Sequence, residues 1–93
     1  MRARVDRDEV QIATNVQLLT AIHPLEPAPR RDGWEYALPI TIEDGAWLAG
    51  GAIVCPGVTV GENTVVGAGA VVTESLPPDV LAAGAPARAV RAL

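Results

Sequence analysis

The chain has 93 residues, enough for one small domain, with 49% hydrophobic residues, no phenylalanine and a formal net charge of −4. The acidic balance gives no electrostatic support to nucleic-acid binding, and no apolar run approaches the roughly eighteen residues that span a bilayer. The charged start argues against a signal peptide, and the single cysteine, Cys55, excludes an internal disulfide and suits a reducing compartment. We therefore expect a cytoplasmic protein.

Residues 10–23 carry the first trace of a six-residue period. Ile12 and Leu18 lie six positions apart, in phase with a stronger repeat further along the chain. Val16 and Ile22 occupy a second position of the same repeat. We expect this stretch to form most of one coil of a repeat structure.

Residues 24–35 interrupt the repeat with the sequence PLEPAPRRDGWE. Three prolines (Pro24, Pro27 and Pro29) forbid a central strand, because proline cannot donate a backbone hydrogen bond, and they favour an extended excursion. The loop spans roughly two hexads, so the phase of the repeat is kept. Residues 36–41 lead back into it. Long ordered loops in small domains are usually functional.

The clearest repeat runs from Ile42 to about Pro77. Every sixth residue is aliphatic: Ile42, Leu48, Val54, Val60, Val66 and Val72. A second column, four places on, is small or aliphatic: Ala46, Ala52, Val58, Thr64, Ala70 and Leu76. A period of six fits neither a helix nor a simple alternating strand, and it is typical of the hexapeptide parallel β-helix.

Three such hexads make one triangular coil, so residues eighteen apart should stack at the spacing of hydrogen-bonded strands. The predicted stacked pairs are Ile42 with Val60, Leu48 with Val66, and Val54 with Val72. The sequence therefore predicts one all-β domain over residues 1–93, a parallel β-helix of about three coils with a protruding loop. Because both ends of such a stack expose unpaired strands, we expect it to oligomerise.

The repeat ends at Pro77-Pro78, and residues 77–93 are expected to cap the prism. Residues 80–84 could add one last strand. The following APARAVRAL predicts a short amphipathic helix or tail, with Arg88 and Arg91 on one face.

Three stretches carry a family resemblance: NVQLLTAIHPLEP, WEYALPITIEDGAWLAGGAIVCPGVTVGENTVVGAGAVVTESLPPDV and AAGAPARAVR. They resemble the C-terminal half of the maltose, galactoside and nodulation-type sugar O-acetyltransferases of the hexapeptide acyltransferase superfamily. The His-Pro before a proline-rich loop, the W-L-x-G-G and the G-x-P-A-R are specific to this subgroup. The resemblance implies left-handed coils, a homotrimer, acetyl-CoA in the groove between subunits, and transfer of the acetyl group to a hydroxyl of a sugar or similar acceptor.

The resemblance also implies roles for single residues. His23, the only histidine, matches the catalytic base, and neutral imidazole can take the proton of an acceptor hydroxyl as it attacks the thioester. An isolated histidine at a corner could otherwise be a hydrogen-bonded surface residue. Trp47 matches a tryptophan that lines the CoA groove, and it could also simply cover the prism edge.

Further matches to cofactor contacts are Gly50, Gly51, Ala68, Thr73, Arg88 and Arg91. The glycines and Ala68 would leave room for the pantetheine arm, or they could reflect corner geometry alone. Arg88 and Arg91 match residues near the nucleotide phosphates, which a guanidinium grips well, or they could lie on a solvated face. The resemblance implies no metal.

The chain departs from the family at three points. Glu74 stands where a lysine is usual, and Ile22 where a threonine is usual. The third departure is that family members are about twice as long, and their earlier part supplies an Asn and an Asp that cannot be placed here. Asn15 has no motif to support it as a substitute for either.

Two functions remain open at this level. The first is an acetyl-CoA-dependent O-acetyltransferase with His23 as general base, and the second is a truncated, non-catalytic module that trimerises and binds CoA. Cys55 lies in a column of small residues, which favours a structural thiol over an acyl carrier. A zinc hydratase needs three histidines around one metal, which one histidine per chain cannot supply.

Overall fold

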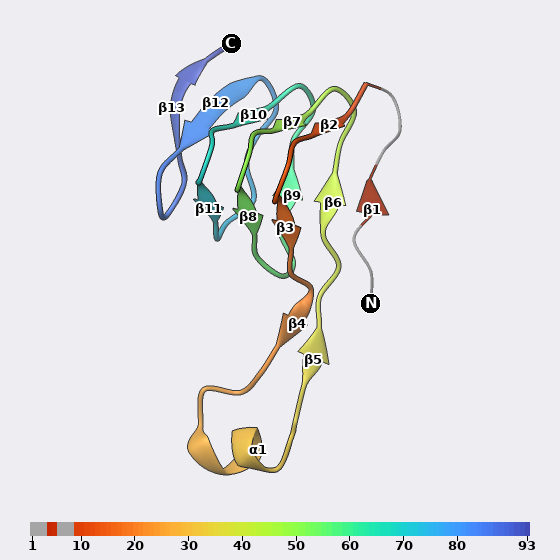
Figure 1. The fold of residues 1–93 in the computed structure, drawn as a ribbon, viewed down its shortest axis with the longest axis vertical. Coiled ribbons are helices and arrows are strands. Elements are labelled where there is room, and N and C mark those ends of the chain that lie inside the picture. The colour runs from red at the N-terminus through yellow and green to blue at the C-terminus, as the bar shows by residue number, and fades with distance from the viewer. Residues whose placement is uncertain (1–3, 6–8) are drawn as a thin grey trace.

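The computed structural model describes residues 4–5 and 9–93, which form a short triangular prism with a ribbon projecting from one corner (Figure 1). Each side of the prism is a small sheet whose neighbouring strands come from successive coils. The first face contains β1 (Arg4–Val5), β6 (Thr41–Ile42) and β9 (Thr59–Val60). The second face contains β2 (Gln11–Ile12), β7 (Trp47–Leu48), β10 (Val65–Val66), β12 (Val80–Ala83) and β13 (Arg88–Ala92). The third contains β3 (Gln17–Leu18), β8 (Ile53–Val54) and β11 (Val71–Val72).

The chain passes from the first face to the second and third in each coil, so the strands β1–β3, β6–β8 and β9–β11 make three coils. All strand pairs between coils are parallel. The predicted all-β prism of about three coils is confirmed. The strand β1 extends the first coil on the N-terminal side of the stretch that the sequence predicted to belong to it.

The aliphatic column fills the interior. All six of its members have no exposed surface, and they pair as the spacing of eighteen requires: Ile42 with Val60, Leu48 with Val66, and Val54 with Val72. Burying such a side chain contributes roughly 1.5–3 kcal/mol. The second column is buried as well, next to the corners where little room is left: Ala46, Ala52, Val58, Thr64, Ala70 and Leu76.

The corner between the second and third faces requires a left-handed backbone. The angle φ is 61° at Asn15, 73° at Gly51 and 70° at Gly69. These turns stack on one another, because the Gly51 amide donates to the Thr14 carbonyl and the Gly69 amide donates to the Gly50 carbonyl, both at 3.0 Å. Glycine adopts this conformation without a steric cost, and asparagine tolerates it better than most side chains. Asn15 is therefore explained by its place in the turn.

The proline-rich stretch forms the tip of the ribbon. Strands β4 (Ala21–Ile22) and β5 (Tyr36–Ala37) pair antiparallel, and the short helix α1 (Pro27–Arg31) closes the tip. The predicted extended excursion is therefore wrong at the tip, where Pro27 and Pro29 lie in the first turn of α1. Proline is tolerated there because the first amides of a helix have no partner within it.

The insertion is longer than the sequence predicted. Residues of β2 precede their partners in β7 by 36 positions, whereas residues of β7 precede theirs in β10 by 18. The insertion therefore adds three hexads rather than two, and because three hexads equal one coil the phase survives. Ile22, which the pattern assigned to the coil, lies in the ribbon instead.

The C-terminal segment is a hairpin. The strand β12 supplies the expected last strand of the second face, and β13 runs antiparallel to it. Of the predicted short helix or tail, the helix does not form, and Arg88 and Arg91 lie on a strand rather than on a helical face. An unpaired strand edge at the end of the stack is costly, and β13 pairs with it.

The turn before β12 is held by two residues of the third coil. Thr64, a buried polar residue, donates from Oγ1 to the Pro77 carbonyl (2.6 Å) and accepts from the Val80 amide (3.3 Å). Gly61 lies directly beneath Pro77 and Pro78. The helix α1 has five residues, and no helix in the described part of the chain is long and apolar enough to cross a membrane.

We predict that Gly61→Ala destabilises the prism. The added methyl carbon would lie 2.5 Å from the backbone of both Pro77 and Pro78, so the turn would have to move. We expect the free energy of unfolding to fall by about 1–3 kcal/mol in a denaturant titration. The control is Gly50→Ala, whose nearest neighbour, the Thr14 carbonyl, is 3.7 Å away. Equal losses in the two variants at one protein concentration would contradict this account of the turn.

Candidate functional site

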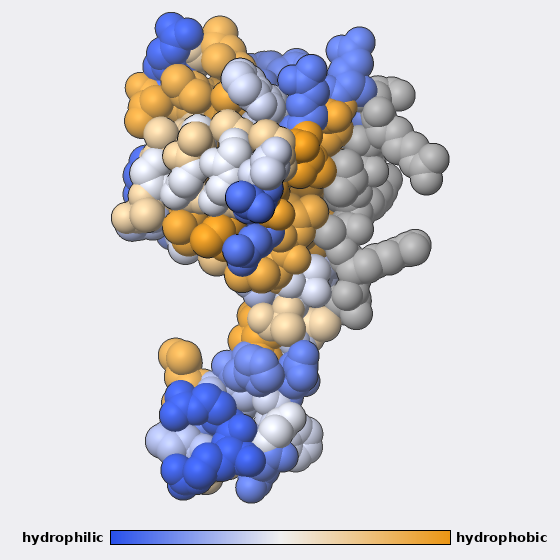
Figure 2. All heavy atoms as spheres, viewed as in Figure 1, coloured by the Kyte–Doolittle hydropathy of each residue, from blue (hydrophilic) through white to orange (hydrophobic). Residues whose placement is uncertain are grey.

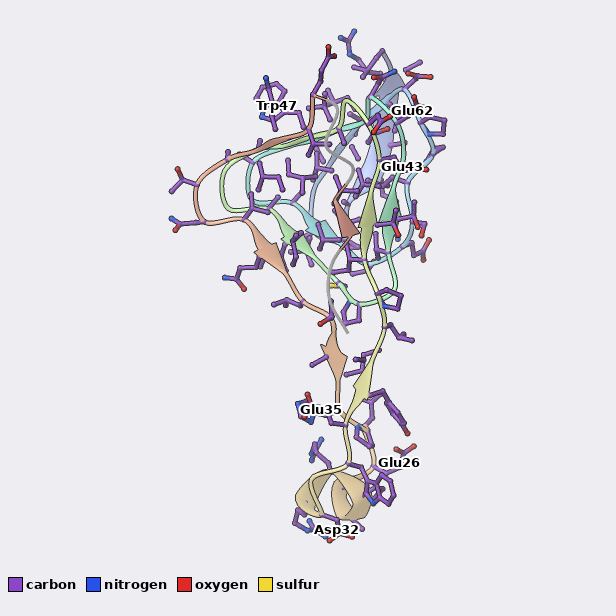
Figure 3. The ribbon with its side chains drawn as sticks, turned by 90° about the vertical axis from the view of Figure 1, so that its right-hand side faces the viewer. Glu26, Asp32, Glu35, Glu43, Trp47 and Glu62 are labelled. Atoms are coloured by element: carbon purple, nitrogen blue, oxygen red, sulfur yellow. The ribbon has the colours of Figure 1, made fainter. Side chains whose placement is uncertain are left out.

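The ribbon places His23 one residue beyond β4. In the pairing of β4 with β5, Ala21 lies opposite Ala37 and Ile22 opposite Tyr36, so the same register places His23 opposite Glu35. The Leu38 amide donates to the Thr20 carbonyl at 2.9 Å, which marks a hydrogen-bonded pair. Hydrogen-bonded and non-hydrogen-bonded pairs alternate along antiparallel strands. Continued one residue past the ends of β4 and β5, this alternation gives His23 and Glu35 the non-hydrogen-bonded, closer kind of pair. Figure 3 shows Glu35 on the ribbon between the tip and the prism.

A carboxylate opposite a histidine suits general-base chemistry. A carboxylate that accepts a hydrogen bond from one ring nitrogen fixes the tautomer, so that the other nitrogen is free to take a proton. His23 is exposed, and a substrate can therefore reach it. The sequence pattern assigned Glu35 no role, since only the antiparallel register of the ribbon brings it to His23.

Four other predicted residues gather on the second face and at its corner with the third. Trp47 lies in β7 with 45% of its surface exposed. Gly50 and Gly51 form the turn after β7, and Ala68 lies in the equivalent turn of the next coil, so these turns stack. The corner presents little but backbone there, and an extended ligand can lie close to it.

The sheet register extends this surface. Val65 pairs with Trp47 on one side and with Leu81 on the other, and Leu81 pairs with Arg91. The outer positions of the second face thus form one row that begins at the indole and ends at a guanidinium. Val65 and Leu81 were not singled out by the sequence pattern, because half-buried aliphatic residues in a strand are usual.

Arg88 and Arg91 are both exposed on β13, and Arg88 donates from a guanidinium nitrogen to the Ala87 carbonyl at 3.1 Å. Thr73 lies elsewhere. It follows β11 at the corner between the third and first faces, which is the corner from which the ribbon departs. Thr73 is exposed and therefore lies on the same side of the prism as the ribbon.

The predicted site residues therefore form two groups on opposite sides of one copy. The molecule is 45 Å along its longest axis, with the ribbon at one end of that axis and the second face at the other (Figure 1). Figure 3 likewise shows Trp47 beside the prism, far from the ribbon tip. Within one copy His23 cannot meet the surface around Trp47, Gly50 and Gly51. A site that uses both groups needs two copies.

Comparison with known proteins shows which proteins the chain is similar to. Residues 39–74 match the bacterial transferase hexapeptide model of six repeats. The galactoside O-acetyltransferase of Escherichia coli K12 is 45% identical over 84 residues, which are 90% of this chain and 41% of that protein. Over most of its length the chain is similar to part of the galactoside and maltose O-acetyltransferases. It spans less than half the length of such relatives.

Solved structures of such enzymes share the fold of this chain. A galactoside acetyltransferase in complex with coenzyme A superimposes with a TM-score of 0.93 at 42% identity, covering 97% of this chain and 44% of the other. A maltose O-acetyltransferase from Clostridium difficile 630 superimposes with a TM-score of 0.90 at 45% identity, covering 92% and 46%. Both are left-handed hexapeptide-repeat β-helices, so the expected winding, an exception to the usual right-handed crossover, is confirmed.

We predict that cysteines substituted for His23 and Glu35 can be joined by a disulfide. In a Cys55→Ser background, the double variant His23→Cys/Glu35→Cys should lose both free thiols on mild oxidation, because a non-hydrogen-bonded pair has the Cα separation that a disulfide requires. Free thiols are counted with Ellman's reagent. The control is His23→Cys/Tyr36→Cys, whose side chains alternate to opposite sides of the ribbon and should stay reduced. A folded first variant that keeps both thiols would contradict the register.

Proposed function

We propose that this chain is the cofactor-binding and base-bearing part of an acetyl-CoA-dependent O-acetyltransferase that acts on a hydroxyl of a sugar or similar small acceptor. The observation that carries the proposal is the position of its one histidine, opposite a carboxylate on an exposed ribbon, in a relative of sugar O-acetyltransferases. The assembly is a homotrimer in the cytoplasm. The cofactor lies between two copies and needs no metal.

The proposal gives each group of residues a different task. Trp47 and the small residues at the second corner (Gly50, Gly51 and Ala68) receive the pantetheine arm of one copy's cofactor. Arg88 and Arg91 on β13 meet its phosphates, since a guanidinium binds phosphate oxygens in a forked geometry. Thr73 lies on the ribbon's side and contributes from the neighbouring copy. Glu74 beside it is a carboxylate and adds no attraction for phosphate.

The reaction is a direct transfer. His23 removes the proton from the acceptor hydroxyl while the oxygen attacks the thioester carbonyl carbon. Glu35 accepts a hydrogen bond from the other ring nitrogen and stabilises the imidazolium that forms. When the tetrahedral intermediate collapses, the carbon–sulfur bond breaks and the imidazolium returns the proton to the CoA sulfur. The acetyl ester and CoA leave, and His23 is neutral again.

The competing function is a non-catalytic module that binds CoA and assembles. It requires only the surface around Trp47, Gly50 and Gly51 and no role for the ribbon. The two functions differ in one result. Release of free CoA from acetyl-CoA in the presence of glucose, maltose or galactose, lost in His23→Ala, supports the transferase. Binding of CoA without any acceptor-dependent release supports the module.

We predict that Glu35→Gln lowers kcat by about 10²-fold or more and changes KM for acetyl-CoA little, because an amide cannot stabilise the imidazolium and the proposal gives Glu35 no contact with the cofactor. Thiol release under saturating acceptor measures both constants. The control is Glu26→Gln near the ribbon tip, which should retain activity. A Glu35→Gln variant with unchanged kcat would remove Glu35 from the mechanism.

We predict that the inactive variants His23→Ala and Trp47→Ala regain transferase activity when they are mixed. In His23→Ala the base is missing, and in Trp47→Ala the cofactor surface is damaged. If each site takes His23 from one copy and Trp47 from the next, an equal mixture refolded together should regain about one quarter of the wild-type activity, because a quarter of the interfaces join two intact halves. A mixture as inactive as its components would contradict a shared site.

A further inference from the structure

We draw no further inference here: the strongest candidate, the exposed apolar surface patch of Trp34, Tyr36 and Leu38 on the ribbon, whose tip stands clear of the prism (Figure 2), carries none because nothing in the structure shows what covers it.

Discussion

The narrow interior of the triangular prism governs the rest of the structure. Each face admits one aliphatic side chain per hexad, so the strands β1–β3 and β6–β11 are two residues long and the chain must turn after every few residues. The six buried residues from Ile42 to Val72 meet this requirement without exception. Because the interior of the prism accepts only this aliphatic column, residues of other chemical types are confined to three places. These are the outer row of each face, the corners, and segments inserted at a corner. All the candidate functional residues lie at such places.

The ribbon shows how extra residues can be inserted into the coil without disturbing its core. It adds as many residues as one full coil, so β6 resumes the phase that β3 left and the core is unaffected. The addition projects from the corner opposite the second face. This geometry separates the histidine from the surface around Trp47 within one copy. In the proposed function, a site that combines the two groups would therefore need a neighbouring copy.

The sequence predicted the parts that local constraints determine. The inner column and the stacked pairs follow from spacing alone, because burial in a narrow core leaves no alternative. The last strand β12 was also expected, but it pairs with β10 at a spacing of 16 residues rather than 18. The C-terminal helix was predicted wrongly: alanine, arginine and leucine favour helix, but the open edge of β12 offers backbone pairing that outweighs this propensity. The position of Glu35 relative to His23 could not be predicted, because Glu35 is twelve residues away and only the register of the ribbon brings it to the opposite strand.

The measurement that tests the account most directly is native mass spectrometry of the chain titrated with coenzyme A. A site shared between copies predicts that cofactor appears on oligomers, at one per chain, and that it stabilises them against dissociation on dilution. Cofactor bound stoichiometrically to single copies, with the same affinity as to the oligomer, would contradict a shared site and would place the whole cofactor surface on one chain.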